Sequence, residues 1–313
     1  MTVFDHPALL YHDTGELLAT AVPFVRTAVA AGDPVLVALP TGNLGLVRDA
    51  LDDDDRVRFA DITATGRNPA RLLPQVLLPF ADAHPGTRVT VVGEPVWPGR
   101  TPVERWACAE HEALLNAAFE GRRAAFLCPY DAARLDDEAI ADAWRTHPVM
   151  IDAGERIPSD EYDDPVRTAE SVNRPLPPPP AGAAVLRYAR LPDLPGVRAF
   201  VRRYATGRLP GERAGELVLA VHELAANTIK HAGGPGTVTV WIEEGMLACQ
   251  VDDGGHIADP LAGRVPPPPS SPSGRGLLMV NELCDLVRMR TGPGGTTIRM
   301  HMALPPAGSA PAQ

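Results

Sequence analysis

An acid, an amide and an imidazole recur at four-residue intervals in the segment HELAANTIKHAGG, residues 222–234. Because an α-helix turns once every 3.6 residues, Glu223, Asn227 and His231 lie on one side of a helix. An amide oxygen can bind Mg²⁺, and a carboxylate one turn away can take a proton from an attacking hydroxyl group. A polar stripe of this kind can also simply face water, so the rest of the chain has to decide between the two interpretations.

Three further motifs follow in the second half of the chain. Asp253-x-Gly255 ends a predicted strand, Gly274-x-Gly276 opens a predicted helix, and a weaker Gly-Gly-Thr-Thr motif containing Thr296 enters the last strand. The aspartate can accept a hydrogen bond from an adenine amino group, and Gly255 lets the backbone approach the base closely. The two later glycines leave backbone N–H groups at a helix N-terminus open to phosphate oxygens. The four motifs together predict a nucleotide site.

In this order the motifs resemble the Bergerat-type (GHKL) ATPase superfamily, and most of all the anti-sigma regulatory factors. These are small serine kinases that bind sigma factors and phosphorylate antagonist proteins. HELAANTIKHA is similar to their N box, VDDGG to their G1 box and GRGLLMVNELCD to their G2 box, and the resemblance covers roughly residues 183–304. It implies binding of ATP and Mg²⁺, with Glu223 as catalytic base and Asn227 as metal ligand. The nucleotide-binding residues that it implies are Asn227, His231, Asp253, Gly255, Gly274, Arg275, Gly276, Leu277 and Thr296.

One position departs from the family pattern. Ile257 stands where the usual DxGxG motif has its second glycine, which implies a tighter base pocket or a lower affinity. A regulator that binds a partner without catalysis, with or without nucleotide, is therefore the alternative to a serine/threonine kinase, and the sequence leaves enzymatic activity open. His231 either contacts the γ-phosphate side or complements the helix dipole. Lys230 either faces solvent or contacts phosphate.

Composition limits the other function classes. The 313 residues carry a net charge of −10, which argues against direct nucleic-acid binding because phosphate contacts need clustered Lys and Arg. No apolar run reaches the roughly 20 residues of a membrane span, and the N-terminus has no signal-peptide pattern. The four cysteines are far apart and lack a CxxC motif, so we expect free thiols in a reducing cytoplasm. The expected partners are a sigma factor or its antagonist, and a homodimer is a further expectation.

Apolar strands alternate with helices in the first half of the chain. Strands are predicted at 34–40, 57–62, 87–93 and 123–129, and helices at 13–32, 41–52, 68–84 with a kink at Pro74, 101–121 and 136–147. This alternation predicts a parallel sheet covered by helices on both faces, an α/β/α architecture. No GxxxxGK[ST] motif occurs, so the pattern does not predict a P-loop NTPase.

This half resembles the MEDS (DcmR-like) sensory domain, a RecA/KaiC-like fold without the Walker A motif. The stretches that carry the resemblance are LLYHDTGELLATAVPFVRTAVAAGDPVLVALP, VTVVGEPVWPGR, EHEALLNAAF and FLCPYDAARL. It implies sensing of a small molecule or partner. Glu94, His111 and Glu112 are candidates for a metal or polar ligand site, and Cys128 and His147 lie at or beyond element ends. A buried histidine with a purely structural role is the alternative for His111.

A polar, proline-rich segment divides the two halves. The predicted organisation is a sensory domain at 1–154, an extended linker at 155–182, an ATP-binding domain at 183–305 and a disordered tail at 306–313. In the second domain we expect a strand at 183–191, a hairpin at 237–255 turning near Glu244-Gly245, a helix at 276–289 and a strand at 296–304. These elements predict a mixed sheet with helices on one face, an α+β two-layer sandwich of the histidine kinase-like ATPase type.

Overall fold

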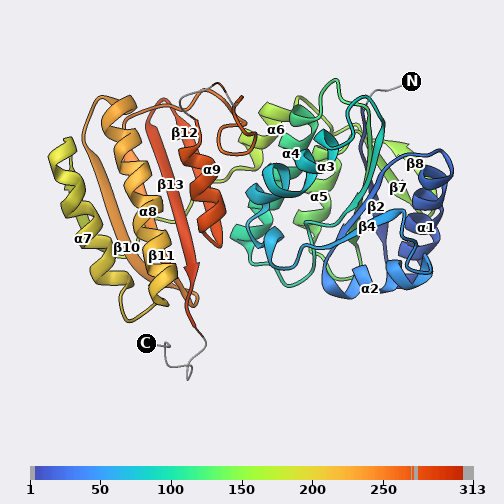
Figure 1. Ribbon diagram of the computed structural model, residues 1–313, viewed down its shortest axis with the longest axis horizontal. Coiled ribbons are helices and arrows are strands. Elements are labelled where there is room, and N and C mark those ends of the chain that lie inside the picture. Colours follow the sequence, from blue (N-terminus) through green and yellow to red (C-terminus); the bar gives the residue numbers. More distant parts are fainter. Residues whose placement is uncertain (1–3, 269, 271–273, 306–313) are drawn as a thin grey trace. The chain divides into compact units, whose positions relative to one another are not determined.

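The computed structural model describes residues 4–268, 270 and 274–305. The chain divides into two compact units, Met1–Arg174 and Pro175–Gln313 (Figure 1). The predicted 306–313 tail lies outside the described residues. In the described part of the chain, no helix combines the length and the apolar character that crossing a bilayer requires.

The N-terminal unit is built on a sheet whose strands run in the order β4-β3-β5-β6-β2-β7-β8, with β1 also paired to β6. The pairings are parallel except for β7 with β8, which is antiparallel. The strands are β1 (Phe4–Asp5), β2 (Pro7–Tyr11), β3 (Val35–Leu39), β4 (Val57–Asp61), β5 (Val89–Gly93), β6 (Ala124–Asp131), β7 (Val149–Asp152) and β8 (Glu155–Pro158).

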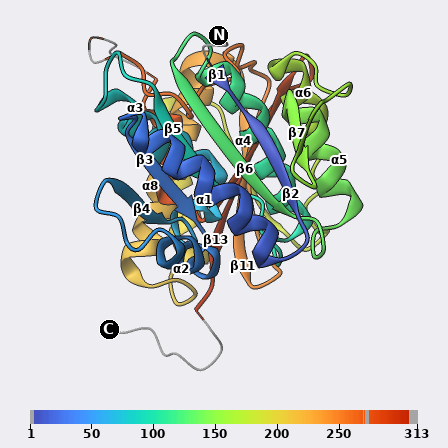
Figure 2. The ribbon, with the colours of Figure 1, turned by 90° about the vertical axis from the view of Figure 1, so that its right-hand side faces the viewer.

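Helices cover both faces of this sheet, as predicted. The helices are α1 (Thr14–Ala30), α2 (Thr41–Ala50), α3 (Leu78–Asp82), α4 (Pro102–Ala118), α5 (Asp137–Thr146) and α6 (Pro165–Val172). In β2, Leu9 packs in the core that includes α1, whereas Ala8 and Leu10 pack in the core that includes α5. Figure 2 shows α1 in front of the sheet and α4 behind it. Because both faces are buried, the strands have continuous apolar sequences rather than alternating ones.

Local sequence signals explain where the helices begin. The Asp13 side chain accepts a hydrogen bond from the Glu16 backbone N–H (2.9 Å) and caps α1. Thr101 and Glu104 form a reciprocal capping box at the start of α4. Each cap satisfies backbone N–H groups that have no partner within the helix.

Several predicted elements of this unit differ from the structure. Strands β2 and β7 were not predicted, and the predicted 68–84 helix is a 3₁₀ turn (Pro69–Arg71), a π-helical turn (Leu73–Leu77) containing Pro74, and α3. Residues 155–174 are not extended linker, because β8 pairs with β7 and α6 packs against α4 and α5. Only Thr168, Ala169 and Val172 of α6 are buried, too sparse an apolar pattern to stand out in the sequence.

The C-terminal unit is a two-layer sandwich. Its five-stranded sheet has the order β12-β13-β11-β10-β9, and helices cover one face (Figure 1). The elements are β9 (Ala184–Tyr188), α7 (Leu194–Ala205), α8 (Gly211–Asn227), β10 (Gly236–Glu243), β11 (Met246–Asp253), α9 (Gly276–Leu283), β12 (Leu286–Gly292) and β13 (Gly295–Ala303). A single apolar core joins these helices to the sheet.

Two expectations for this unit need correction. The described pairings are all antiparallel, so the sheet is not mixed. The predicted 276–289 helix ends at Leu283, and an unpredicted strand, β12, begins at Leu286. The predicted β10–β11 hairpin is present, and Glu244 and Gly245 both have positive φ in its two-residue turn.

A candidate nucleotide cavity in the C-terminal unit

A cavity of about 920 Å³ opens between α8, the start of α9 and the ends of the central strands. All ten predicted site residues of the C-terminal domain line it. They are Glu223, Asn227, His231, Asp253, Gly255, Gly274, Arg275, Gly276, Leu277 and Thr296. The volume falls within the roughly 300–1,000 Å³ of small-molecule sites. Residues from all four motifs, which are well separated along the chain, therefore meet at one cavity.

Helix α8 presents the acid and the amide to this cavity. The side chains of Glu223 and Asn227 form no hydrogen bond or ion pair with another described residue, so both are available to a ligand. The backbone after Asn227 continues as a π-helical turn (Thr228–Ala232) and stops at Gly233, which has a left-handed φ of 65°. His231 and Lys230 are exposed and also line the cavity. π-Turns inside helices are frequent at functional sites.

The start of α9 faces Glu223 and Asn227 at close range. A Cβ atom added to Gly276 would lie 3.2 Å from Asn227 Nδ2 and 3.4 Å from Glu223 Oε2. A side chain at position 276 would thus crowd the amide and fill the space between the two helices. The glycine keeps the N-terminal backbone of α9, with its unpaired N–H groups, open to the cavity.

Asp253 lines the cavity from the end of β11. Its Oδ1 accepts a hydrogen bond from the Gly255 backbone N–H (2.8 Å), and its Oδ2 accepts one from the Thr228 hydroxyl (2.6 Å). The Tyr188 hydroxyl donates in turn to Thr228 Oγ1 (2.9 Å). Burial raises the pKa of Tyr188 to about 12, so it remains a donor. This chain of hydrogen bonds fixes the orientation of the carboxylate.

Thr228 and Tyr188 were not predicted as parts of the site. Thr228 directly follows Asn227 in the sequence, but Tyr188 lies 40 residues earlier, on the edge strand β9. The sequence signal that could have identified the tyrosine is Gly236, opposite it on β10. A Cβ atom there would lie 2.3 Å from the Tyr188 hydroxyl oxygen, so only glycine leaves room for the ring.

The last strand holds the loop after Asp253 in place. The Thr296 hydroxyl donates to the Gly255 carbonyl oxygen (2.9 Å), and Gly295 has a φ of 117°. A Cβ atom at position 295 would lie 2.2 Å from the Asp253 carbonyl oxygen. Ile257, at the position of the missing glycine, lines the cavity, and its backbone N–H donates to Thr291 Oγ1 (2.9 Å).

The three candidates in the N-terminal unit do not come together. Glu94, beyond the end of β5, is completely buried and accepts hydrogen bonds from Tyr11 (2.8 Å) and Asn43 (2.7 Å). Burial is the main cause that raises the pKa of Glu94 to about 7. Glu112, on α4, instead lies in a buried cluster with two histidines and a cysteine. Neither Glu94 nor His111 belongs to this cluster. His111 is buried on α4, in line with the structural alternative.

Two family models match the chain, one in each unit. The model of the MEDS domain (methanogen/methylotroph, DcmR sensory domain) matches residues 5–148, and the histidine kinase-like ATPase domain model matches residues 188–302. None of the curated proteins matches. A solved structure of the RsbU and RsbW domains of Rv1364c from Mycobacterium tuberculosis is similar at 21% identity, with a TM-score of 0.29. The match covers 39% of this chain and only 32% of that one.

Proposed function

The chain joins a MEDS sensory domain to a histidine kinase-like ATPase domain, and from this premise we propose that it is a signalling regulator whose C-terminal unit binds ATP with Mg²⁺. Its proposed output is control of a sigma factor or of that factor's antagonist, in the cytoplasm, with the N-terminal unit sensing a small molecule or a partner. One observation carries the nucleotide proposal. Glu223 and Asn227, the glycine at the start of α9 and Asp253 at the end of β11 all line one cavity, with Gly276 directly against the acid and the amide.

The purine end of the proposed site lies at Asp253. Each carboxylate oxygen accepts one hydrogen bond from the protein and has lone-pair capacity for another, which an exocyclic amino group can use. A Cβ atom on Gly255 would lie 2.9 Å from the Ala232 Cβ, so glycine is also needed for the packing of this loop against the π-turn. Apolar contacts to the base would come from Ile257, Leu277 and Ile298.

The phosphate end lies between α8 and α9. The Asn227 side-chain oxygen would bind Mg²⁺, a cation that takes few protein ligands and keeps several waters. Backbone N–H groups at the start of α9, together with Lys230 and Arg275, would compensate the charge of the phosphates. Both long basic side chains are exposed at the edge of the cavity, where they can reach the triphosphate.

The proposed reaction is transfer of the γ-phosphoryl group to a serine hydroxyl of the antagonist protein. The serine oxygen attacks phosphorus, the bond from phosphorus to the bridging β,γ-oxygen breaks, ADP leaves, and Glu223 accepts the serine proton. Glu223 lies one helical turn before the proposed metal ligand, and this spacing supports a position beside the terminal phosphate. The second candidate is a docking module without catalysis, which the presence of Ile257 at the base pocket favours.

Three variants on α8 separate binding from catalysis. Glu223→Gln keeps the size of the side chain but removes the base, so we expect ATP affinity close to wild type and phosphate transfer reduced at least about 100-fold. Asn227→Ala should weaken Mg·ATP binding roughly 10- to 100-fold, because a ligand of a charged group is lost. Glu212→Gln is the matched control, since Glu212 is exposed on the same helix and does not line the cavity.

Calorimetry with ATP, with and without Mg²⁺, measures binding, and incubation with labelled ATP and candidate antagonist proteins measures transfer. Transfer that survives Glu223→Gln would reject Glu223 as the base. Tight binding by wild type without transfer to any candidate would favour the docking module. Equal Mg·ATP affinity for wild type and Asn227→Ala would overturn the metal assignment.

A further inference from the structure

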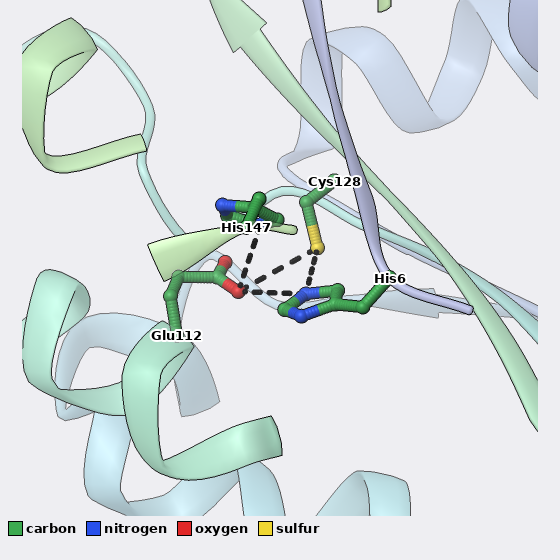
Figure 3. Close-up of side chains that lie close together, drawn as sticks. All are labelled: His6, Glu112, Cys128 and His147. Atoms are coloured by element: carbon green, nitrogen blue, oxygen red, sulfur yellow. Dashed lines mark hydrogen bonds and ion pairs between the residues drawn. The ribbon is translucent and has the colours of Figure 1, made fainter. Parts of the chain in front are cut away.

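Four side chains that can bind a metal converge inside the N-terminal unit (Figure 3). His6 lies between β1 and β2, Glu112 on α4, Cys128 in β6 and His147 between α5 and β7. The exposed fractions are 1% for His6, 0% for Glu112, 2% for Cys128 and 0% for His147. One ligand atom from each residue lies within 4.8 Å of all the others. A thiol, a carboxyl and two imidazoles thus share one small volume without access to bulk water.

Four of the six separations between these atoms are close to those of a tetrahedral ligand set. Glu112 Oε2 lies 3.2 Å from His6 Nε2 and 3.5 Å from His147 Nε2. Cys128 Sγ lies 3.2 Å from His6 Nε2 and 3.6 Å from Glu112 Oε2. Ligands at tetrahedral corners around Zn²⁺ are about 3.3 Å apart for nitrogen and oxygen pairs and about 3.5 Å when one atom is sulfur, given bond lengths of about 2.0 and 2.3 Å.

Hydrogen bonds on the far side of each imidazole ring fix which nitrogen faces the cluster. His6 Nδ1 lies 3.0 Å from Asn116 Oδ1, and His147 Nδ1 lies 3.0 Å from the Ala143 carbonyl oxygen. Both oxygens are acceptors, so each Nδ1 carries a proton and donates it. In the neutral rings the Nε2 lone pairs then point into the cluster. Metal-binding histidines are commonly held in this way by a carbonyl or amide oxygen behind the ring.

Two buried polar atoms of the cluster lack hydrogen-bond partners among the residues that the structure describes. His147 Nε2 approaches Glu112 Oε2 without forming a hydrogen bond, and Glu112 Oε1 also has no partner. Buried polar atoms without partners cost free energy and call for an explanation. A cation at the centre would bind the imidazole lone pairs and a carboxylate oxygen at once.

We propose that His6, Glu112, Cys128 and His147 bind one Zn²⁺ ion. The combination of thiolate, imidazole and carboxylate in a tetrahedral arrangement suits zinc better than magnesium or calcium, which prefer oxygen ligands. On binding, the Cys128 thiol releases its proton to solvent and the sulfur forms a bond to the metal. The thiolate and carboxylate charges then balance the two positive charges of the ion, which makes the site suitable for burial.

The proposed ion would join segments at the two ends of the N-terminal unit. His6 precedes β2, and β2 lies between β6, which carries Cys128, and β7, which follows His147. The ion would therefore hold these strands and α4 together, and its binding would stabilise the unit. This proposal concerns the N-terminal unit alone and stands whether or not the C-terminal cavity binds nucleotide.

The test uses the full-length chain, stripped with a chelator and titrated with Co²⁺ as a spectroscopic substitute for Zn²⁺. We expect one Co²⁺ per chain, the strong visible absorption of tetrahedral cobalt, a sulfur-to-cobalt charge-transfer band in the near ultraviolet, and loss of all bands on adding Zn²⁺. Cys128→Ala should abolish the charge-transfer band. Cys249→Ala is the matched control, because Cys249 is equally buried but lies in the C-terminal unit, and it should leave the spectrum unchanged.

X-ray absorption at the zinc edge keeps the test independent of whether a variant folds. In the zinc-loaded wild-type chain we expect one sulfur at about 2.3 Å and three nitrogen or oxygen neighbours at about 2.0–2.1 Å. The midpoint of thermal unfolding should also rise when zinc is added. Absence of Co²⁺ and Zn²⁺ binding at micromolar concentrations would overturn the proposal and leave the four residues as a hydrogen-bonded core network. A zinc shell without sulfur, or a cobalt spectrum unaffected by Cys128→Ala, would overturn it as well.

Discussion

Replacing Glu94 by glutamine should remove a defined part of the pH dependence of stability in the N-terminal unit. The Glu94 carboxyl is completely buried and accepts hydrogen bonds from Tyr11 and Asn43. Burial, which disfavours the charged form, is the first cause that raises its pKa from 4.5 to about 7, and the nearby Asp131 adds to the shift. Glutamine fits the same space, and the Tyr11 hydroxyl can accept a hydrogen bond from its amide.

The sign of the effect follows from proton linkage. A carboxyl whose pKa is higher in the folded state than in the unfolded state holds its proton more tightly when folded. Its contribution to stability is fully present below pH 4.5 and is lost as the pH rises through 7. With these two pKa values, the free energy of unfolding should fall by about 2.5 kcal/mol between pH 5 and pH 8, at about 1.36 kcal/mol per pKa unit.

Urea unfolding at a series of pH values measures this difference. Three of the four tryptophans, Trp97, Trp106 and Trp144, belong to the N-terminal unit, so tryptophan fluorescence mainly reports its unfolding. The wild-type free energy of unfolding minus that of Glu94→Gln should fall by about 2.5 kcal/mol from pH 5 to pH 8. Glu170→Gln, at an exposed position of α6, serves as the control. If the wild-type and Glu94→Gln curves run parallel across this range, the assignment of a raised pKa to Glu94 is wrong.

The remaining predictions concern the C-terminal cavity. Thr228→Val removes the hydroxyl that joins Tyr188 to Asp253, so we expect the free energy of unfolding to fall by about 1–3 kcal/mol and ATP affinity to fall as well. Urea unfolding and calorimetry measure the two effects, and unchanged values would refute the role of this hydrogen-bond chain. Gly276→Ala should stabilise α9 by up to about 1 kcal/mol while its Cβ, 3.2 Å from Asn227 Nδ2, displaces the amide and weakens Mg·ATP binding. An alanine variant that binds Mg·ATP as tightly as wild type would show that this close approach does not matter for the ligand.

The ten residues predicted for the C-terminal site all line one cavity, and they could be identified because each motif is local. Asp253-x-Gly255 and Gly274-x-Gly276 each lie within three residues, and their order along the chain was enough to place them around one cavity. The hydrogen bond from Tyr188 to Thr228 joins residues 40 positions apart, and no local pattern indicates it. β12 was missed because LVRM continues the preceding helix without glycine or proline, although it is a strand paired with β13.

In the N-terminal unit, too, the sequence predicted local elements but not contacts between residues far apart in the chain. Its alternating strands and helices follow from apolar periodicity, and the sequence alone was sufficient to predict the layered parallel sheet. The buried cluster depends on tertiary packing instead, since His6 lies 122 positions from Cys128. Glu112 was identified as a candidate, but its partners could not be, because which side chains meet at a sheet face depends on strand order and register.

The most direct test of the nucleotide proposal is an experimental structure of the chain with Mg²⁺ and a non-hydrolysable ATP analogue. We expect the adenine amino group within hydrogen-bonding distance of the Asp253 carboxylate, the metal bound to the Asn227 side-chain oxygen, and the terminal phosphate between Glu223 and the backbone at Gly276. A nucleotide bound elsewhere, or bound in this cavity with its base at α9 and its phosphates at Asp253, would contradict it.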